Sequence, residues 1–388
     1  MKTPVYVDNN ATTAVAPEVV EAMLPFLKDQ WGNPSSMHTF GGGIKKYIDQ
    51  AREQVAAFLG AEDPNEIIFT SCGSESDNLA IRGAVDALGG HPHFITTRVE
   101  HAAVLGPAHY LEDKGFRVST LEVNEEGELD LDQVRALSIT GKKNVASVMW
   151  ANNETGVIFP IAKIGEIIKE AGGVFHTDAV QIAGKLPVSV KDLPIDLLSI
   201  SGHKIHAPKG VGALYVRRGT KLTPQIMGGH QERGRRAGTE NVPYIIGLAK
   251  ACELAAQTMQ DDVKQESALR DRLEAGILAT CKGARVNGAK AERLPNTTNI
   301  SFEYVEGEAI LLMLDDVGIC ASTGSACASG SLEPSHVLRA MDVPRAMLHG
   351  SIRFSLGRYN TASDVDYILE KLPPIINRLR EMSPFAKD

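Results

Sequence analysis

The chain has 388 residues, of which 43% are hydrophobic and 23% are charged, and its formal net charge is −8. This length is enough for a sizeable core and favours two domains. The interspersed, mildly acidic charge excludes a basic surface for nucleic acid, and no apolar run reaches the roughly 20 residues of a membrane helix.

The five cysteines are scattered and include no CxxC pair. This pattern argues against a disulfide framework and against a structural zinc site. The N-terminal residues MKTPVYVDNN also lack the apolar region of a signal peptide. We therefore expect a cytoplasmic protein with no membrane or nucleic-acid partner.

Seven short apolar or β-branched runs bounded by Gly, Asn or Asp predict buried strands. In chain order they are residues 66–71, 93–98, 116–123, 144–150, 173–178, 196–201 and 212–216. Amphipathic helices are predicted between them, for example over residues 42–60, ending at Gly60, and over residues 161–173. The alternation predicts an α/β fold with a mostly parallel seven-stranded sheet, whose ligands gather at the carboxyl ends of the strands.

The pattern changes after Asn241. Helical stretches at residues 242–257 and 266–281 are followed by a strand near 297–305, a helix at 308–317, a strand at 351–356 and a helix at 364–382. This succession predicts a smaller α+β domain in the C-terminal third. We expect a large domain over residues 15–257 and a small domain formed by residues 1–14 and 258–388.

Polar residues follow the predicted strands where each strand ends. They are Gly73, Ser74, His101, Asn152, Asn153, Asp178, Gln181, Ser201, His203 and Lys204. Each alone has an ordinary explanation as a turn residue, a helix cap or a structural histidine. Together they match the needs of pyridoxal 5′-phosphate (PLP), which uses a lysine for its aldehyde, a carboxylate for its pyridine nitrogen and a helix N-terminus for its phosphate.

Motifs along nearly the whole chain carry a family resemblance. They are VDNNATT (7–13), GNPSS (32–36), FTSCGSESDNLA (69–80), EH (100–101), NNETG (152–156), HTDAVQ (176–181), SGHKIHAPKGVGALYVRRG (201–219), RRAGTENV (235–242), GSAC (324–327), LEPSHVLRAM (332–341) and SIRFSLGRY (351–359). With these motifs the chain resembles the cysteine desulfurases of the NifS/IscS type. These are class V aminotransferase-like enzymes with the fold of type I PLP-dependent transferases.

The resemblance implies a role for each matching residue. Lys204 would form the Schiff base and carry protons, and Asp178 would pair with the pyridinium. Gln181 would bind the ring hydroxyl, and His101 would stack on the ring and serve in catalysis. The phosphate would be held by Gly73, Ser74, Ser201, His203 and Thr239 of the partner subunit in a homodimer. Arg353 and Asn153 would bind the substrate carboxylate, with Asn33 nearby; Asn153 would also contact the cofactor.

Cys327 lies in a run of Gly, Ser and Ala residues, which favours a mobile, exposed thiol. Cys252 and Cys281, by contrast, lie among apolar residues on helical patterns and are typical core residues. The resemblance makes Cys327 the nucleophile that takes sulfur from L-cysteine as a persulfide, leaving L-alanine. The sulfur would pass to iron–sulfur cluster assembly through a scaffold protein of the NifU/IscU type, or to other acceptors. No firm metal ligand is predicted, although Cys327 is a candidate transient cluster ligand.

Three alternatives stay open at this point. An aminotransferase on the same fold would release a keto acid and would have no use for Cys327. A selenocysteine lyase would act on selenocysteine and spare cysteine. A non-enzymatic sulfur or iron–sulfur carrier would be colourless, with Lys204 in a structural role. The sulfur acceptor is also open between general iron–sulfur assembly, nitrogenase maturation and tRNA thiolation.

Overall fold

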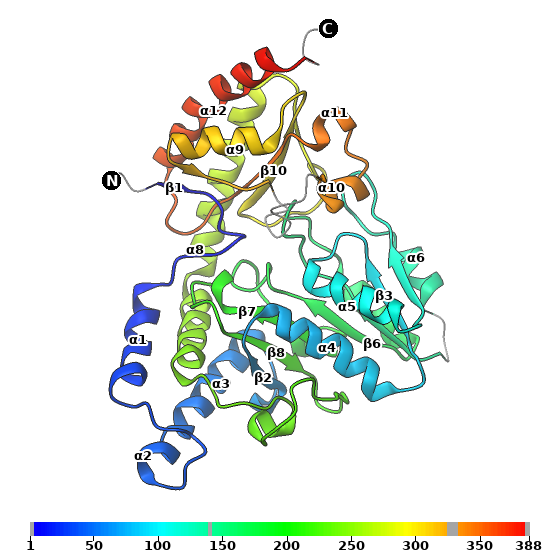
Figure 1. Ribbon diagram of the computed structural model, residues 1–388, viewed down its shortest axis with the longest axis vertical. Helices are drawn as coiled ribbons and strands as arrows, with labels where there is room; N and C mark the ends of the chain where they lie inside the picture. Colours follow the sequence, from blue (N-terminus) through cyan, green and yellow to red (C-terminus); the bar gives the residue numbers. More distant parts are fainter. Residues whose placement is uncertain (1–3, 139–141, 324–332, 385–388) are drawn as a thin grey trace.

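The computed structural model describes residues 4–138, 142–323 and 333–384, and its centre is a seven-stranded sheet (Figure 1). The order of its strands is β2-β8-β7-β6-β5-β3-β4. They span β2 (Ile67–Thr70), β3 (His93–Thr97), β4 (Val118–Leu121), β5 (Asn144–Ser147), β6 (Val174–Asp178), β7 (Leu197–Ser201) and β8 (Gly212–Val216). All seven lie within the predicted runs, so the predicted fold class is confirmed.

The sheet is parallel except for β8, which pairs antiparallel with both β7 and β2. β4 is shorter than predicted because it is an edge strand, with only Leu121 of its four residues buried. The carboxyl ends of β3, β5, β6 and β7 therefore lie at the same edge of the sheet. This edge is where a ligand site is expected.

Two hydrophobic clusters cover the two faces of the sheet. One is formed with α4 (Gly73–Leu88) and α5 (Ala102–Asp113). The other is formed with α1 (Pro17–Lys28), α3 (Lys45–Leu59), α6 (Leu131–Leu137), α7 (Ile161–Glu170) and the first half of α8 (Val242–Thr280). Gly60 ends α3 as predicted, because its φ of 67° is a left-handed conformation that glycine adopts readily.

A third hydrophobic cluster lies in the C-terminal third, around strands β10 and β12 (Figure 1). The order β12-β10-β9 forms a three-stranded antiparallel sheet, and β1 pairs in parallel with β11. The elements are β1 (Val5–Tyr6), β9 (Ala284–Val286), β10 (Thr297–Phe302), α9 (Gly307–Asp316), β11 (Ile319–Cys320), α10 (His336–Ala340), α11 (Arg345–Leu348), β12 (Ser351–Ser355) and α12 (Ala362–Met382). The short strands β9 and β11 have no recognisable pattern in the sequence and were not predicted.

Helix α8 joins the two halves of the molecule without interruption. Leu248 and Cys252 in its first half belong to the cluster against the large sheet, whereas Leu273 and Ile277 belong to the C-terminal cluster. The proposed division near residue 257 thus falls inside one continuous helix. Among the helices of the described ranges, none is both long enough and apolar enough to span a membrane.

Candidate active site

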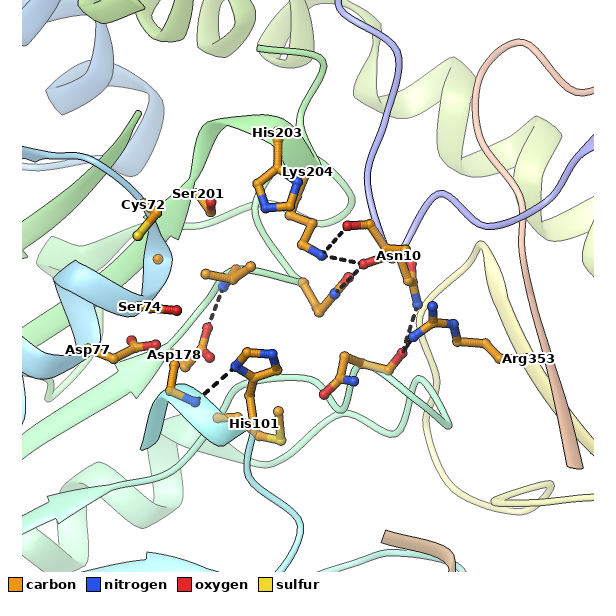
Figure 2. Close-up of a pocket in the computed structure, with 17 residues that line it drawn as sticks. Asn10, Cys72, Ser74, Asp77, His101, Asp178, Ser201, His203, Lys204 and Arg353 are labelled. Atoms are coloured by element: carbon orange, nitrogen blue, oxygen red, sulfur yellow. Dashed lines mark hydrogen bonds between the residues drawn. The ribbon is translucent and has the colours of Figure 1, made fainter. Parts of the chain in front are cut away.

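A cavity of about 260 Å³ opens at the carboxyl ends of the central strands (Figure 2). Ten of the predicted site residues line it: Gly73, Ser74, His101, Asn153, Asp178, Gln181, Ser201, His203, Lys204 and Arg353. They come from six separate segments of the chain. The cavity therefore brings together the constellation that the sequence predicted.

Lys204 reaches this cavity from a single 3-10 turn, Gly202–Lys204, that directly follows β7. Its Nζ donates hydrogen bonds to the backbone oxygens of Asn10 (2.5 Å) and Ala11 (2.8 Å). The N-terminal segment is fastened to the same turn, since the Thr13 backbone N–H donates to the His203 oxygen at 2.9 Å. The two carbonyl groups of the N-terminal segment thus hold the Lys204 amine at the wall of the cavity.

Asp178 ends β6 at the base of the cavity and is 6% exposed. Burial raises the pKa of its carboxyl, while the nearby His101, the Val180 backbone N–H and Lys204 lower it. His101 caps the N-terminus of α5, and its Nδ1 accepts a hydrogen bond from the Ala103 backbone N–H at 3.1 Å. In the neutral ring this bond places the proton on Nε2.

The N-terminus of α4 forms an anion cradle on one side of the cavity. The first N–H groups of a helix lack intrahelical partners. In α4 the backbone N–H of Glu75 donates to Cys72 Sγ, and that of Ser76 donates to the Cys72 oxygen. The two preceding backbone N–H groups belong to Gly73 and Ser74, and both of these residues line the cavity. A Cβ on Gly73 would lie 3.3 Å from Ser201 Cβ, so glycine keeps this cradle open.

Arg353 lies across the cavity from the α4 cradle, on β12 (Figure 2). Its guanidinium is 2% exposed; Nη2 pairs with Asp8 Oδ1 at 2.7 Å, and Nη1 donates to the Asn153 backbone oxygen at 2.9 Å. An anion site and a buried cation thus face each other, with Lys204 and Asp178 between them. This spacing suits a ligand with one anionic group at each end.

Three predicted residues of the described ranges do not line this cavity: Asn33, Asn152 and Thr239. Asn152 is buried and donates to the Val99 backbone oxygen at 2.9 Å. Asn33 and Thr239 are both exposed and lie outside its lining. Pro34 and Glu240, their neighbours in sequence, line one and the same surface pocket elsewhere on the molecule. Cys327 lies outside the described residues.

The cavity also contains residues that the sequence analysis did not single out. The most polar of them are Asn10 and Asp77. Asn10 is inside the quoted VDNNATT motif, so the motif was the signal for it. Asp77 lies one turn into α4, where a periodic pattern predicts a helix but does not say which polar side chain faces a ligand.

The donor set fits PLP. A lysine for the aldehyde, a buried carboxylate for the pyridine nitrogen and an open helix N-terminus for the phosphate all line one cavity. His203 beside the cradle is a neutral donor, since burial and the charges of Lys204 and Lys209 lower its pKa to about 4. The residues present therefore match the chemistry of the cofactor.

Comparisons with known proteins agree with this reading. Residues 5–368 match the family model for class V aminotransferases. The chain is 60% identical to a cysteine desulfurase of Trichormus azollae over 99% of this chain and 96% of that one. It is 55% identical to the cysteine desulfurase NifS of Azotobacter vinelandii, over 98% and 94% of the two chains.

Solved structures give the same result. A NifS-like protein superposes with a TM-score of 0.91 at 39% identity, covering 97% of this chain and 100% of that chain. A cysteine desulfurase from Thermococcus onnurineus superposes with a TM-score of 0.86 at 28% identity, covering 97% and 95%. The chain therefore belongs to the class V aminotransferase family and, within it, to the PLP-dependent cysteine desulfurases.

Proposed function

We propose that this protein takes sulfur from L-cysteine as a persulfide on Cys327 and releases L-alanine. The observation that supports this most directly is that Lys204, Asp178 and Arg353 line the same cavity. They provide a lysine, an acid and a buried guanidinium that can bind a carboxylate. A transaminase needs the same three groups. The choice of desulfuration rests on Cys327 together with the 60% identity to a cysteine desulfurase.

Eight residues of this chain would hold PLP in the cavity. Lys204 would bind its aldehyde, Asp178 its pyridine nitrogen, and the N–H groups of Gly73 and Ser74 its phosphate, together with Ser201 and His203. His101 would stack on the ring and Gln181 would bind its hydroxyl. When bound, PLP supplies an acceptor for electrons released at the α-carbon of an amino acid.

The chain's own groups would bind and orient the amino acid. Arg353 is suited to the substrate carboxylate because a guanidinium donates two parallel hydrogen bonds to it. Asn153 lies beside it, since its backbone oxygen accepts from Arg353 Nη1 at 2.9 Å. Lys204 Nζ would move the proton at the α-carbon, with His101 Nε2 as a second proton donor.

The sulfur step balances without an external oxidant. The Cys327 thiolate attacks the sulfur of the substrate, an S–S bond forms, and the bond between that sulfur and the β-carbon breaks. The electron pair of the broken bond stays on carbon, which takes a proton and becomes the methyl group of alanine. The persulfide then passes to an acceptor, for which we propose a scaffold protein of the NifU/IscU type or another thiol-bearing protein in the cytoplasm. Cys327 would be at most a transient ligand of a cluster.

The protein would act as a homodimer. Large apolar side chains are exposed on the segment around α2 (Thr39–Gly42) and on the loop before α8, namely Trp31, Met37, Phe40, Ile226 and Met227. The two segments adjoin, because Pro34 and His230 line the same surface pocket, and exposed apolar side chains on adjoining segments are typical of a protein–protein interface. Asn33 and Thr239 lie on these same two segments. In a homodimer, each would therefore contact the ligand bound in the cavity of the partner subunit.

The test is to incubate the purified protein with L-cysteine and a reductant and to measure alanine and sulfide together. We expect equal amounts of the two products. The Cys327→Ala variant should keep the yellow absorbance of bound PLP and produce no sulfide, whereas Cys320→Ser should behave like the unsubstituted protein.

Each alternative has its own outcome in this experiment. A keto acid in place of alanine would indicate an aminotransferase. Turnover of selenocysteine without cysteine would indicate a selenocysteine lyase. A colourless protein that binds no PLP would indicate a carrier, and normal sulfide release by Cys327→Ala would remove this cysteine from the mechanism.

A further inference from the structure

Lys185 is a buried lysine behind the cavity that none of the proposed roles uses. It is only 8% exposed, and it does not line the cavity itself. Lysine is rarely buried to this extent without a specific partner, because its amine loses hydration. The burial of the Lys185 amine therefore indicates a specific role for it.

The amine of Lys185 is bonded to the residue one turn before it. Nζ donates to the backbone oxygen of Gln181 at 3.0 Å and to its side-chain Oε1 at 3.2 Å. The buried carboxyl of Glu266 on α8 lies close enough to raise the pKa of Lys185, which burial lowers. Both the charged and the neutral amine have N–H groups to donate, so this contact to Gln181 persists in either state.

The contact decides which way the Gln181 amide points. A primary amide has one oxygen acceptor and one NH2 donor, and only the acceptor can receive a bond from an ammonium. Since Oε1 faces Lys185, Nε2 is turned to the other side, where it donates to the Asn10 backbone oxygen at 3.1 Å. Lys204 Nζ donates to the same oxygen at 2.5 Å, so Gln181 Nε2 and Lys204 Nζ converge on the Asn10 backbone oxygen (Figure 2).

We propose that Lys185 is a positioning residue that fixes the Gln181 amide so that the cavity receives an N–H donor and not a carbonyl oxygen. The group served would be the ring hydroxyl oxygen of PLP, so the inference rests on the role proposed above for Gln181. A donor at this place favours the ionised form of that oxygen. Without Lys185 the amide is free to flip and to offer its oxygen instead.

The charged and titratable groups around Lys185 come from four segments. Glu266 and Asp262 lie on α8, Lys204 and His206 follow β7, Arg353 lies on β12, and Arg358 follows it. Glu266 raises the pKa of the buried amine, whereas Lys204 and Arg353 lower it. These groups also act on the cofactor electrostatically, so a single variant does not separate the effect of Lys185 through the Gln181 amide from its direct charge effect. A double-mutant cycle separates the two.

The experiment measures the pH dependence of the visible absorbance of bound PLP, with no substrate present. Lys185→Met should move the midpoint of this titration upward by about one pH unit, since a hydrogen bond to an ionised group is lost. It should also weaken PLP binding several-fold. Gln181→Leu should give a similar shift, and the double variant Lys185→Met/Gln181→Leu should shift no further than Gln181→Leu alone.

Two results would overturn the proposal: an unchanged midpoint in Lys185→Met, or shifts of the two single variants that add in the double variant. Lys185→Arg keeps donors at this position, so its midpoint should stay close to that of the unsubstituted protein. If Lys185→Met does not fold, the background Lys185→Met/Glu266→Gln removes the partner carboxylate as well, and the cycle with Gln181→Leu is repeated on it.

These outcomes are separate from a failure of the proposed function. A protein that makes no alanine from cysteine but shows the non-additive absorbance cycle would refute the reaction and support the role of Lys185. A protein that makes alanine and sulfide but shows additive shifts would refute the role of Lys185 alone.

Discussion

Three buried carboxyl groups lie near the base of the cavity, and their surroundings differ. Burial and the neighbouring charge of Asp178 raise the pKa of Asp77 well above its usual value, and burial raises the pKa of Glu100 to about 8. Burial also raises the pKa of Asp178, but His101 and Lys204 oppose this shift. Of the three carboxyl groups, Asp178 is the one whose negative charge neighbouring cations stabilise, whereas burial favours the neutral form of Asp77 and Glu100.

This difference predicts that replacing aspartate by asparagine has a large effect at residue 178 and a small one at residue 77. Asp178→Asn should lower the rate of alanine formation by about 100-fold or more, because the pyridine nitrogen loses its anionic partner. Asp77→Asn should change the rate by no more than about threefold, since it replaces a neutral acid by a neutral amide of the same shape. Alanine release at saturating L-cysteine is the measurement. A loss in Asp77→Asn as large as in Asp178→Asn would show that Asp77 carries the charge.

The position of the phosphate cradle at the start of α4 depends on its close contact with strands β7 and β8. A Cβ on Gly212 would lie 2.8 Å from the Ile200 oxygen and 2.9 Å from the backbone carbon of Cys72. Both neighbours are backbone atoms, which have little room to yield. Glycine at the first residue of β8 therefore allows the α4 N-terminus to lie against the sheet.

Gly212→Ala should displace the N-terminus of α4 and weaken the binding of PLP by about tenfold or more, with a loss of about 1–3 kcal/mol in the free energy of unfolding. The measurements are fluorescence titration with PLP and urea unfolding of the apo protein. Gly106→Ala is the matched control: nothing lies within 4 Å of its added Cβ, and it is exposed inside α5, so it should bind PLP normally. Equal PLP affinity in the two variants would contradict the role of Gly212.

At the scale of the whole molecule, the site depends on the N-terminal segment. Asn10 donates through Nδ2 to Thr297 Oγ1 at 2.8 Å and accepts on Oδ1 from Asn296, while its backbone oxygen receives Lys204. The same segment carries Asp8, the partner of Arg353. Residues 8–13 thus connect the C-terminal third of the chain to Lys204.

The exposed apolar segments predict the assembly. Met227→Glu places a charge on a side chain that is 80% exposed, and in a homodimer it should shift the protein to monomers in sedimentation velocity. The monomer should also bind PLP more weakly, because Thr239 of the partner subunit would no longer reach the phosphate. Leu312→Glu, at an exposed residue of α9 on the opposite end of the molecule, should leave the assembly unchanged (Figure 1). A dimer that survives Met227→Glu intact would place the interface elsewhere.

The elements with a strong local pattern were predicted well, and the weak ones were not. The seven strands and helices α3, α7 and α12 were found because apolar periodicity and Gly caps are properties of neighbouring residues. The strands β9 and β11 are two or three residues long, too short for any periodicity. β4 was overestimated because nothing in its sequence marks it as an edge strand.

The sequence by itself determined the family, the sheet, and the chemical groups that the site holds, because these follow from residue types, local periodicity and motif spacing. Only the tertiary structure decided which groups meet. That Asn10 supplies an oxygen to Lys204, that Asp77 lies beside the cavity, and that Gln181 Nε2 reaches Asn10 depends on the packing of distant segments. The physical reason is that contacts across about 190 residues are set by how whole elements pack, and the side chains at either end carry no local record of them.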